Sequence, residues 1–138
     1  MIWKFLIASF LATGSAQAQE WEYLTTSDNG TVVSVDPTKV RELPPIEIRR
    51  PFPVRQIWVN WDFSKVRTQK ARSGVTLSQF DCKSETMLVV SIVHYSPDGT
   101  VLKSDRESDF DFNYDPVVLG SVGYTIMEFA CGRTALPR

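Results

Sequence analysis

The sequence MLVVSIVHY at residues 87–95, followed directly by SPDG at 96–99, decides the fold of this chain. The first stretch is apolar on both faces of an extended chain, so it predicts a strand inside a sheet. The second has the residue order of a type I turn, with proline second and glycine last. A strand that ends in a tight turn indicates antiparallel pairing with the next strand.

Outward from this stretch, further segments carry the alternation or the β-branched and aromatic residues of strands. They are Trp21–Thr26, Thr31–Val35, Val54–Phe63, Val75–Lys83 and Thr100–Lys103. The Asn-Gly pair at the end of Ser27–Gly30 predicts a hairpin turn between the first two. Asp36 before Pro37 predicts a short capped turn. Four prolines in Leu43–Pro53 predict an irregular or edge segment.

The end of the chain has helical rather than strand periodicity. Apolar side chains share one helical face at Leu119, Val122, Ile126, Phe129 and Ala130. Ser121 is suited to cap the start of this helix, and Gly132 to end it. The sequence therefore predicts an α+β domain, with an antiparallel β-sheet of about six strands packed against a C-terminal α-helix.

The chain begins like an export signal. Lys4 supplies a positive start, residues 5–13 are apolar, and Ala16-Gln17-Ala18 has the small residues that a signal peptidase requires. The apolar run is far shorter than the roughly 20 residues of a membrane-spanning helix. We expect cleavage after Ala18 and a single exported domain over residues 19–138, periplasmic, secreted or at the cell surface. No cysteine follows the leader for lipid attachment, and no transmembrane anchor is expected.

The only two cysteines are Cys82 and Cys131. An even pair in an exported chain predicts one disulfide, because thiols are not kept reduced outside the cytoplasm. A metal site is the alternative, but a single histidine and the absence of a Cys-x-x-Cys motif disfavour it. The disulfide would join the C-terminal helix to the strand that carries Cys82.

No catalytic set is visible, so we expect no enzyme and no cofactor. His94 is the one candidate general base, with a hydrogen-bonded structural histidine as the alternative. Alternating acids at Asp105, Glu107, Asp109 and Asp111 resemble half of a calcium loop. They lack the glycine and glutamate that such a loop requires, and they also fit a solvated strand edge.

Charge is unevenly distributed although the formal net charge is only −1, which disfavours a nucleic-acid binder. Eight basic residues face three acidic ones between residues 41 and 72, whereas acids predominate between 98 and 115. A basic surface for an anionic partner, such as a sulfated glycan, a lipopolysaccharide phosphate or an acidic protein, is one interpretation. Solubilising charge on edge strands is the other. The candidate binding residues are Arg49, Arg50, Arg55, Lys65, Arg67, Lys70 and Arg72.

The order of several short motifs resembles the surface-adhesin protein E family of Gram-negative bacteria. The matching positions cover nearly the whole mature chain. They are Trp21, Ser27–Gly30, Val35-Asp36, Trp58, Asp62, Ser73, Phe80-Asp81-Cys82, Tyr95, Asp98-Gly99, Pro116, Gly120-Ser121, Glu128 and Ala130-Cys131.

This resemblance implies an antiparallel sheet packed on a C-terminal helix, a Cys82–Cys131 link and a possible homodimer. It also implies adhesion to host matrix proteins. The chain departs from the family's lipid-anchored member in lacking a lipidation cysteine, and it adds the proline-rich segment Leu43–Pro53. The alternative function is that of a periplasmic structural or accessory protein of the cell envelope with no host ligand.

Overall fold

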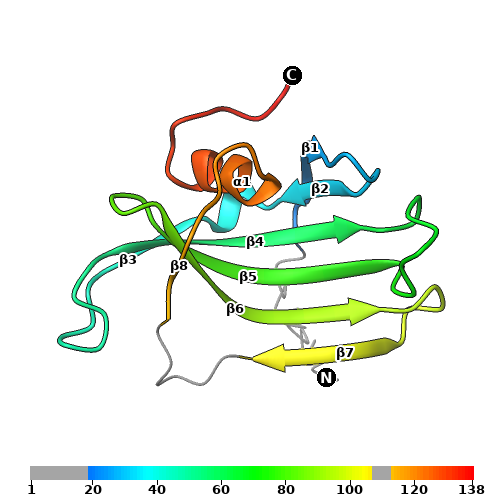
Figure 1. Cartoon of the computed structure of the whole chain (residues 1–138), viewed down its shortest axis with the longest axis horizontal. Helices are drawn as coiled ribbons and strands as arrows, with labels where there is room; N and C mark the ends of the chain where they lie inside the picture. The colour runs from blue at the N-terminus through cyan, green and yellow to red at the C-terminus, as the bar shows by residue number, and fades with distance from the viewer. Residues whose placement is uncertain (1–18, 107–112) are drawn as a thin grey trace, which may run out of the picture.

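The computed structural model describes residues 19–106 and 113–138, so the expected leader and residues 107–112 of the acidic stretch lie outside it (Figure 1). One antiparallel sheet follows the path β1-β2-β4-β5-β6-β7, with β3 added to β4 and β8 added to β6. The elements in chain order are β1 (Glu22–Thr26), β2 (Val32–Val35), a 3₁₀ turn (Pro37–Lys39), β3 (Arg41–Leu43), β4 (Val54–Asp62), β5 (Ser73–Asp81), β6 (Thr86–Tyr95), β7 (Val101–Arg106), β8 (Asp115–Pro116) and α1 (Val122–Ala130).

The predicted fold class is confirmed, but the expected number of about six strands was too low. The described residues form eight strands, and the additional two are β3 and β8, with three and two residues. β3 pairs with the start of β4, and β8 pairs with Thr86 and Met87 on β6. Strands this short carry no readable alternation, and only their tertiary partners define them.

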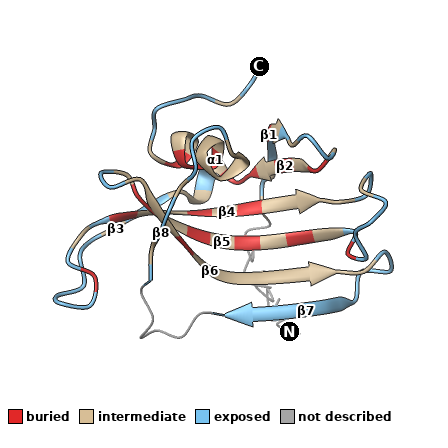
Figure 2. Cartoon of the chain, viewed as in Figure 1, coloured by how far each residue is buried: buried red, intermediate tan, exposed pale blue. Residues whose placement is uncertain are grey.

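The core lies between the sheet and α1 on the side of β1, β2 and β4. Figure 2 shows buried positions on β4, β5 and α1, whereas β7 is exposed along its length. β6 is inside the sheet as predicted, between β5 and β7, yet only Leu88 on it is buried. The buried cluster comprises Leu24, Val33, Val35, Ile57, Val59, Phe80, Ile126, Met127 and Ala130.

The predicted helix forms with the predicted signals at both ends. The Ser121 hydroxyl accepts a hydrogen bond from the Tyr124 N–H at 3.2 Å, which caps the first turn. Gly132 ends the helix with a φ of +74°, a left-handed conformation that glycine adopts without steric penalty. The expected apolar stripe was wrong at Leu119, which precedes the helix and is 78% exposed. Met127 is fully buried on that face instead.

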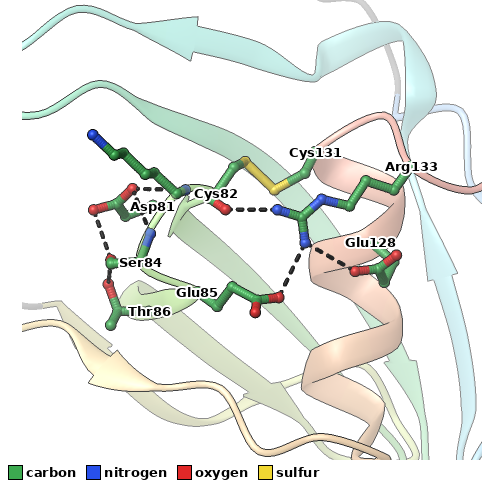
Figure 3. Close-up of a disulfide and its surroundings, with 9 residues drawn as sticks. Asp81, Cys82, Ser84, Glu85, Thr86, Glu128, Cys131 and Arg133 are labelled. Atoms are coloured by element: carbon green, nitrogen blue, oxygen red, sulfur yellow. Dashed lines mark hydrogen bonds and ion pairs between the residues drawn. A yellow bond between two sulfur atoms is a disulfide. The ribbon is translucent and has the colours of Figure 1, made fainter.

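A disulfide between Cys82 and Cys131 joins the β5–β6 turn to the end of α1, as predicted (Figure 3). Arg133 reinforces this connection, because its guanidinium donates to the Cys82 carbonyl at 2.6 Å and to Glu85 and Glu128 at 3.0 Å. The C-terminal end of α1 is therefore held to the sheet by one covalent bond and a set of charge-assisted hydrogen bonds.

In the part of the chain that the structure describes, no helix is long and apolar enough to cross a membrane.

Candidate binding surface

The seven candidate basic residues lie at opposite ends of the sheet. Arg49 and Arg50 lie between β3 and β4, Arg55 is the second residue of β4, and the other four lie on the loop at residues 63–72 that follows β4. The rest of β4, from Arg55 to Asp62, places about 23 Å of extended chain between the two groups. They are thus not one continuous basic patch.

Arg50 is buried, with 1% of its surface exposed. Its guanidinium donates to the carbonyl of Pro44 at 2.9 Å and to that of Phe52 at 2.5 Å, while its Nε has no hydrogen-bond partner. The side chain therefore holds the proline-rich segment together from inside and presents no charge to a partner. The sequence showed a cation at this position, but its burial depends on contacts that the local pattern does not encode.

The loop at residues 63–72 is ordered by its own backbone. The N–H of Phe63 donates to the Arg72 carbonyl at 2.8 Å, and the N–H of Arg72 donates to Tyr95 on β6 at 2.8 Å. Inside the loop, Val66 and Gln69 donate to Phe63 and Val66 respectively. These bonds close the loop and fix its backbone.

The four cations of this loop point into solvent. Lys65, Arg67, Lys70 and Arg72 are all exposed, and none forms a salt bridge with another described residue. Asp62 lies at the base of the loop, and its pKa is lowered because the backbone N–H and the side chain of Ser64 donate to its carboxylate. The nearby charges of Arg72 and Lys65 lower this pKa further.

Two short turns lie at the same end of the sheet as this loop. They connect β1 to β2 and β6 to β7, and each carries an aspartate, Asp28 and Asp98. The Asp98 carboxylate accepts hydrogen bonds from Ser96 and from the backbone and side chain of Thr100, which lower its pKa to about 2. This end of the sheet thus presents four exposed cationic side chains on one loop, and these charges attract anionic groups.

His94 packs as a structural residue. Its ring lies edge-on to Phe63 with centroids 5.7 Å apart, above Gly74 on β5. A Cβ at Gly74 would come within 2.8 Å of the His94 ring, so the glycine makes room for it. No hydrogen bond joins His94 to a described serine or acid, and the geometry resembles ring packing rather than a catalytic pair.

The structure describes only part of the stretch of alternating acidic residues. Asp105 lies on the exposed strand β7 and pairs with Lys103 at 3.3 Å, whereas Glu107, Asp109 and Asp111 lie outside the described residues. Within residues 19–106 and 113–138, no three potential metal ligands come together.

The family model of surface-adhesin protein E matches residues 21–132. The chain belongs to this family. The match spans β1 to the end of α1, and so includes both cysteines and the loop at residues 63–72. Neither a curated protein nor a solved structure matches the chain. The family makes the chain an adhesin-like protein of the exported or surface kind.

Sequence reasoning missed two residues that the structure makes conspicuous. Arg133 clamps the turn at Cys82, and Ile48 is 94% exposed within the proline-rich segment. The sequence offered one signal for each. Arg133 directly follows the glycine that ends the helix, and Ile48 lies between two charged residues.

Proposed function

We propose that the mature chain is an exported, non-enzymatic binding domain whose loop at residues 63–72 receives an anionic partner. The partner is an anionic glycan or an acidic surface of a host matrix protein. The observation that carries this proposal is the set of four exposed cations on one backbone-closed loop. Because the loop is ordered before binding, less conformational entropy is lost when the cations engage a partner.

The membership in an adhesin family supports the binding role, and the packing of His94 on Phe63 and Gly74 supports the absence of catalysis. The separation of the basic residues refines the proposal. Arg50 is excluded from it by burial, and Arg49 and Arg55 lie at the other end of the sheet.

Heparin-agarose chromatography of oxidised residues 19–138 tests the loop. Replacing Arg67, Lys70 and Arg72 with alanine removes three exposed charges from it. The expected loss is about 1–3 kcal/mol, or roughly 5- to 150-fold in affinity, so that elution shifts to much lower salt. The affinity of the unmodified protein should fall as salt is raised, because these charges are screened.

A matched control removes the same amount of charge elsewhere. Arg41, Lys103 and Arg138 are also exposed, and their replacement with alanine should leave retention nearly unchanged. Equal loss in both variants would show that only net charge matters, and unchanged retention of the loop variant would refute the proposed surface.

Protease treatment of intact cells tests the location that adhesion requires. Digestion of the domain on whole cells is expected if it acts at the surface. Protection until the outer membrane is opened would favour the alternative function, a periplasmic accessory protein of the envelope.

A further inference from the structure

Asp36, which directly follows β2, is a fully buried carboxylate whose hydrogen-bonding capacity is only partly used. Its Oδ1 accepts hydrogen bonds from the backbone N–H of Thr38 at 3.0 Å and from the hydroxyl of Thr38 at 2.5 Å. Its Oδ2 accepts one hydrogen bond, from the N–H of Glu20 at 3.1 Å. The Nζ of Lys39 approaches Oδ2 only to 3.9 Å, which is beyond hydrogen-bond distance. Because each oxygen of an ionised carboxylate has two acceptor sites, Oδ2 can take a further donor.

The Asp36 side chain is negatively charged at neutral pH. Burial raises its pKa, but the hydrogen bonds from Thr38 and Glu20 and the charge of Lys39 outweigh burial. The pKa of Asp36 therefore lies below its ordinary value of 3.8. A charge that is buried in this way is stabilised by a cation with good hydrogen-bond geometry.

The backbone nitrogen of Gln19 lies close to this carboxylate. Glu22 at the start of β1 pairs with Val35, so the chain before β1 runs alongside Asp36. Glu20 already donates to Oδ2, and consecutive Cα atoms are only about 3.8 Å apart. The side-chain Oε1 of Gln19 is itself buried and has no hydrogen-bond partner. Two acceptor oxygens near the nitrogen of residue 19 can thus take a further donor.

We propose that removal of the leader after Ala18 converts the nitrogen of Gln19 into an ammonium group that binds Asp36. Cleavage breaks the bond between the Ala18 carbonyl carbon and this nitrogen. The oxygen of a water molecule goes to Ala18 as part of its new carboxylate, and the nitrogen takes up protons. An amide nitrogen with one N–H becomes a cation with three, which can donate to the Asp36 Oδ2 and to the unpaired Oε1 of Gln19. The fold gains this ion pair only after the leader is removed.

The surrounding charges determine how the pair responds to pH. Glu20 is exposed beside the amine, Lys39 belongs to the 3₁₀ turn, and β4 contributes the Trp58 carbonyl, which accepts from the Asp36 N–H at 3.3 Å. The two carboxylates favour the ammonium and Lys39 opposes it, so the amine pKa should rise above its ordinary value of about 8. The added stability should be fully present below about pH 8 and be lost as the pH rises through the raised pKa.

This inference goes beyond the proposed function, since it does not involve the loop at residues 63–72. Thermal unfolding of three oxidised proteins tests it. They are residues 19–138 with a free amine, the same chain acetylated at Gln19, and residues 16–138, which retain the uncharged Ala16-Gln17-Ala18. Acetylation removes the charge and leaves the chain length unchanged. At about pH 6 the free amine should raise the unfolding temperature by about 3–5 °C over both other proteins, and at about pH 10 the difference should vanish.

A substitution at Asp36 separates this ion pair from a general effect of the terminus. Asp36→Asn keeps an acceptor for Thr38 but removes the negative charge. The difference between the free and acetylated proteins should then disappear, whatever the unfolding temperature of the variant itself. Asp28→Asn is the matched control, because Asp28 is an exposed aspartate on the β1–β2 connection, and it should leave the difference intact.

Titration of the Gln19 amine, followed by nuclear magnetic resonance of its α-proton, should give a pKa of about 9 or higher instead of about 8. An ordinary pKa, or equal unfolding temperatures of the free and acetylated proteins, would overturn the proposal. Mass spectrometry of the protein isolated from cells should find a free Gln19 amine. A different N-terminus would overturn the proposal, and so would a lactam formed when the amine attacks the side-chain Cδ of Gln19 and expels ammonia, because neither contains the ammonium.

Discussion

The two ends of the sheet are held in different ways. At the end that carries Cys82, the disulfide and Arg133 join segments that are distant in the sequence, and the buried Arg50 holds the proline-rich segment together. At the other end, the turns between β1 and β2 and between β6 and β7 and the loop at residues 63–72 are held mainly by hydrogen bonds within each connection. We refer to these as the stapled end and the free end.

The arginines at the two ends of the sheet have different roles. Arg50 at the stapled end is surrounded by carbonyl groups and is structural, whereas Arg72 at the free end is exposed. The same residue type thus stabilises the fold at one end and is available for binding at the other. Removing the disulfide, or the contacts of Arg50 or Arg133, should lower the free energy of unfolding more than removing any charge from the loop at residues 63–72.

The largest expected effect is removal of the disulfide. Replacing Cys82 and Cys131 with serine releases a loop with a sequence separation of 49 residues, which should lower the free energy of unfolding by about 4 kcal/mol in the chain-entropy model. Urea denaturation measures this loss. Hydrogen exchange should rise at the C-terminal end of α1 and much less in residues 63–72, and an equal rise at both ends would contradict the distinction.

The next largest effect is expected at Arg50. Arg50→Ala removes the buried side chain that donates to the carbonyl groups of Pro44 and Phe52, at a cost of about 2 kcal/mol. The turn at residues 44–50 should then become a site of proteolytic cleavage. Arg72→Ala is the control at the free end and should change unfolding by less than about 0.5 kcal/mol. Equal effects of the two variants would show that burial of Arg50 does not matter.

A smaller effect is expected at the start of α1, which lies near the free end. Ser121 shares a cavity of about 430 Å³ with residues 25–29 of the β1–β2 connection. Ser121→Ala removes the acceptor for the Tyr124 N–H and should cost about 1 kcal/mol. Thermal unfolding measures the loss, and Ser121→Asp should restore most of it, since aspartate is also a good cap.

The smallest effect concerns acid titration of a single free-end turn. The pKa of Asp98 is lowered from 3.8 to about 2, so its hydrogen bonds contribute fully above pH 3.8 and are lost as the pH falls toward 2. Nuclear magnetic resonance of its carboxyl carbon should give a midpoint near 2. Ser96→Ala with Thr100→Ala should move this midpoint up toward 3.8, and an unchanged midpoint would exclude these hydrogen bonds as the cause.

Local signals were sufficient for most of the fold. The alternation in residues 75–83, the Asp36-Pro37 cap and the Ser121 cap each predict their own element, because the physical cause lies within a few residues. The pairing of β8 depends on β6, which is distant in the sequence, and Leu119 is exposed because the helix begins only at Val122.

The candidate site was less predictable for the same reason. A cluster of cations in the sequence does not reveal that β4 separates its members or that Arg50 turns inward. The pairing of the strands decides which charged residues share a surface, and the linear order of the charges does not show that pairing.

We expect an anionic partner to bind the free end and to leave the stapled end unoccupied. Titration of ¹⁵N-labelled residues 19–138 with a heparin oligosaccharide, followed by amide chemical shifts, locates the bound surface. The shifts should concentrate on residues 63–72 and their neighbours at 96–100. Shifts concentrated on residues 41–55, or none at all, would contradict it.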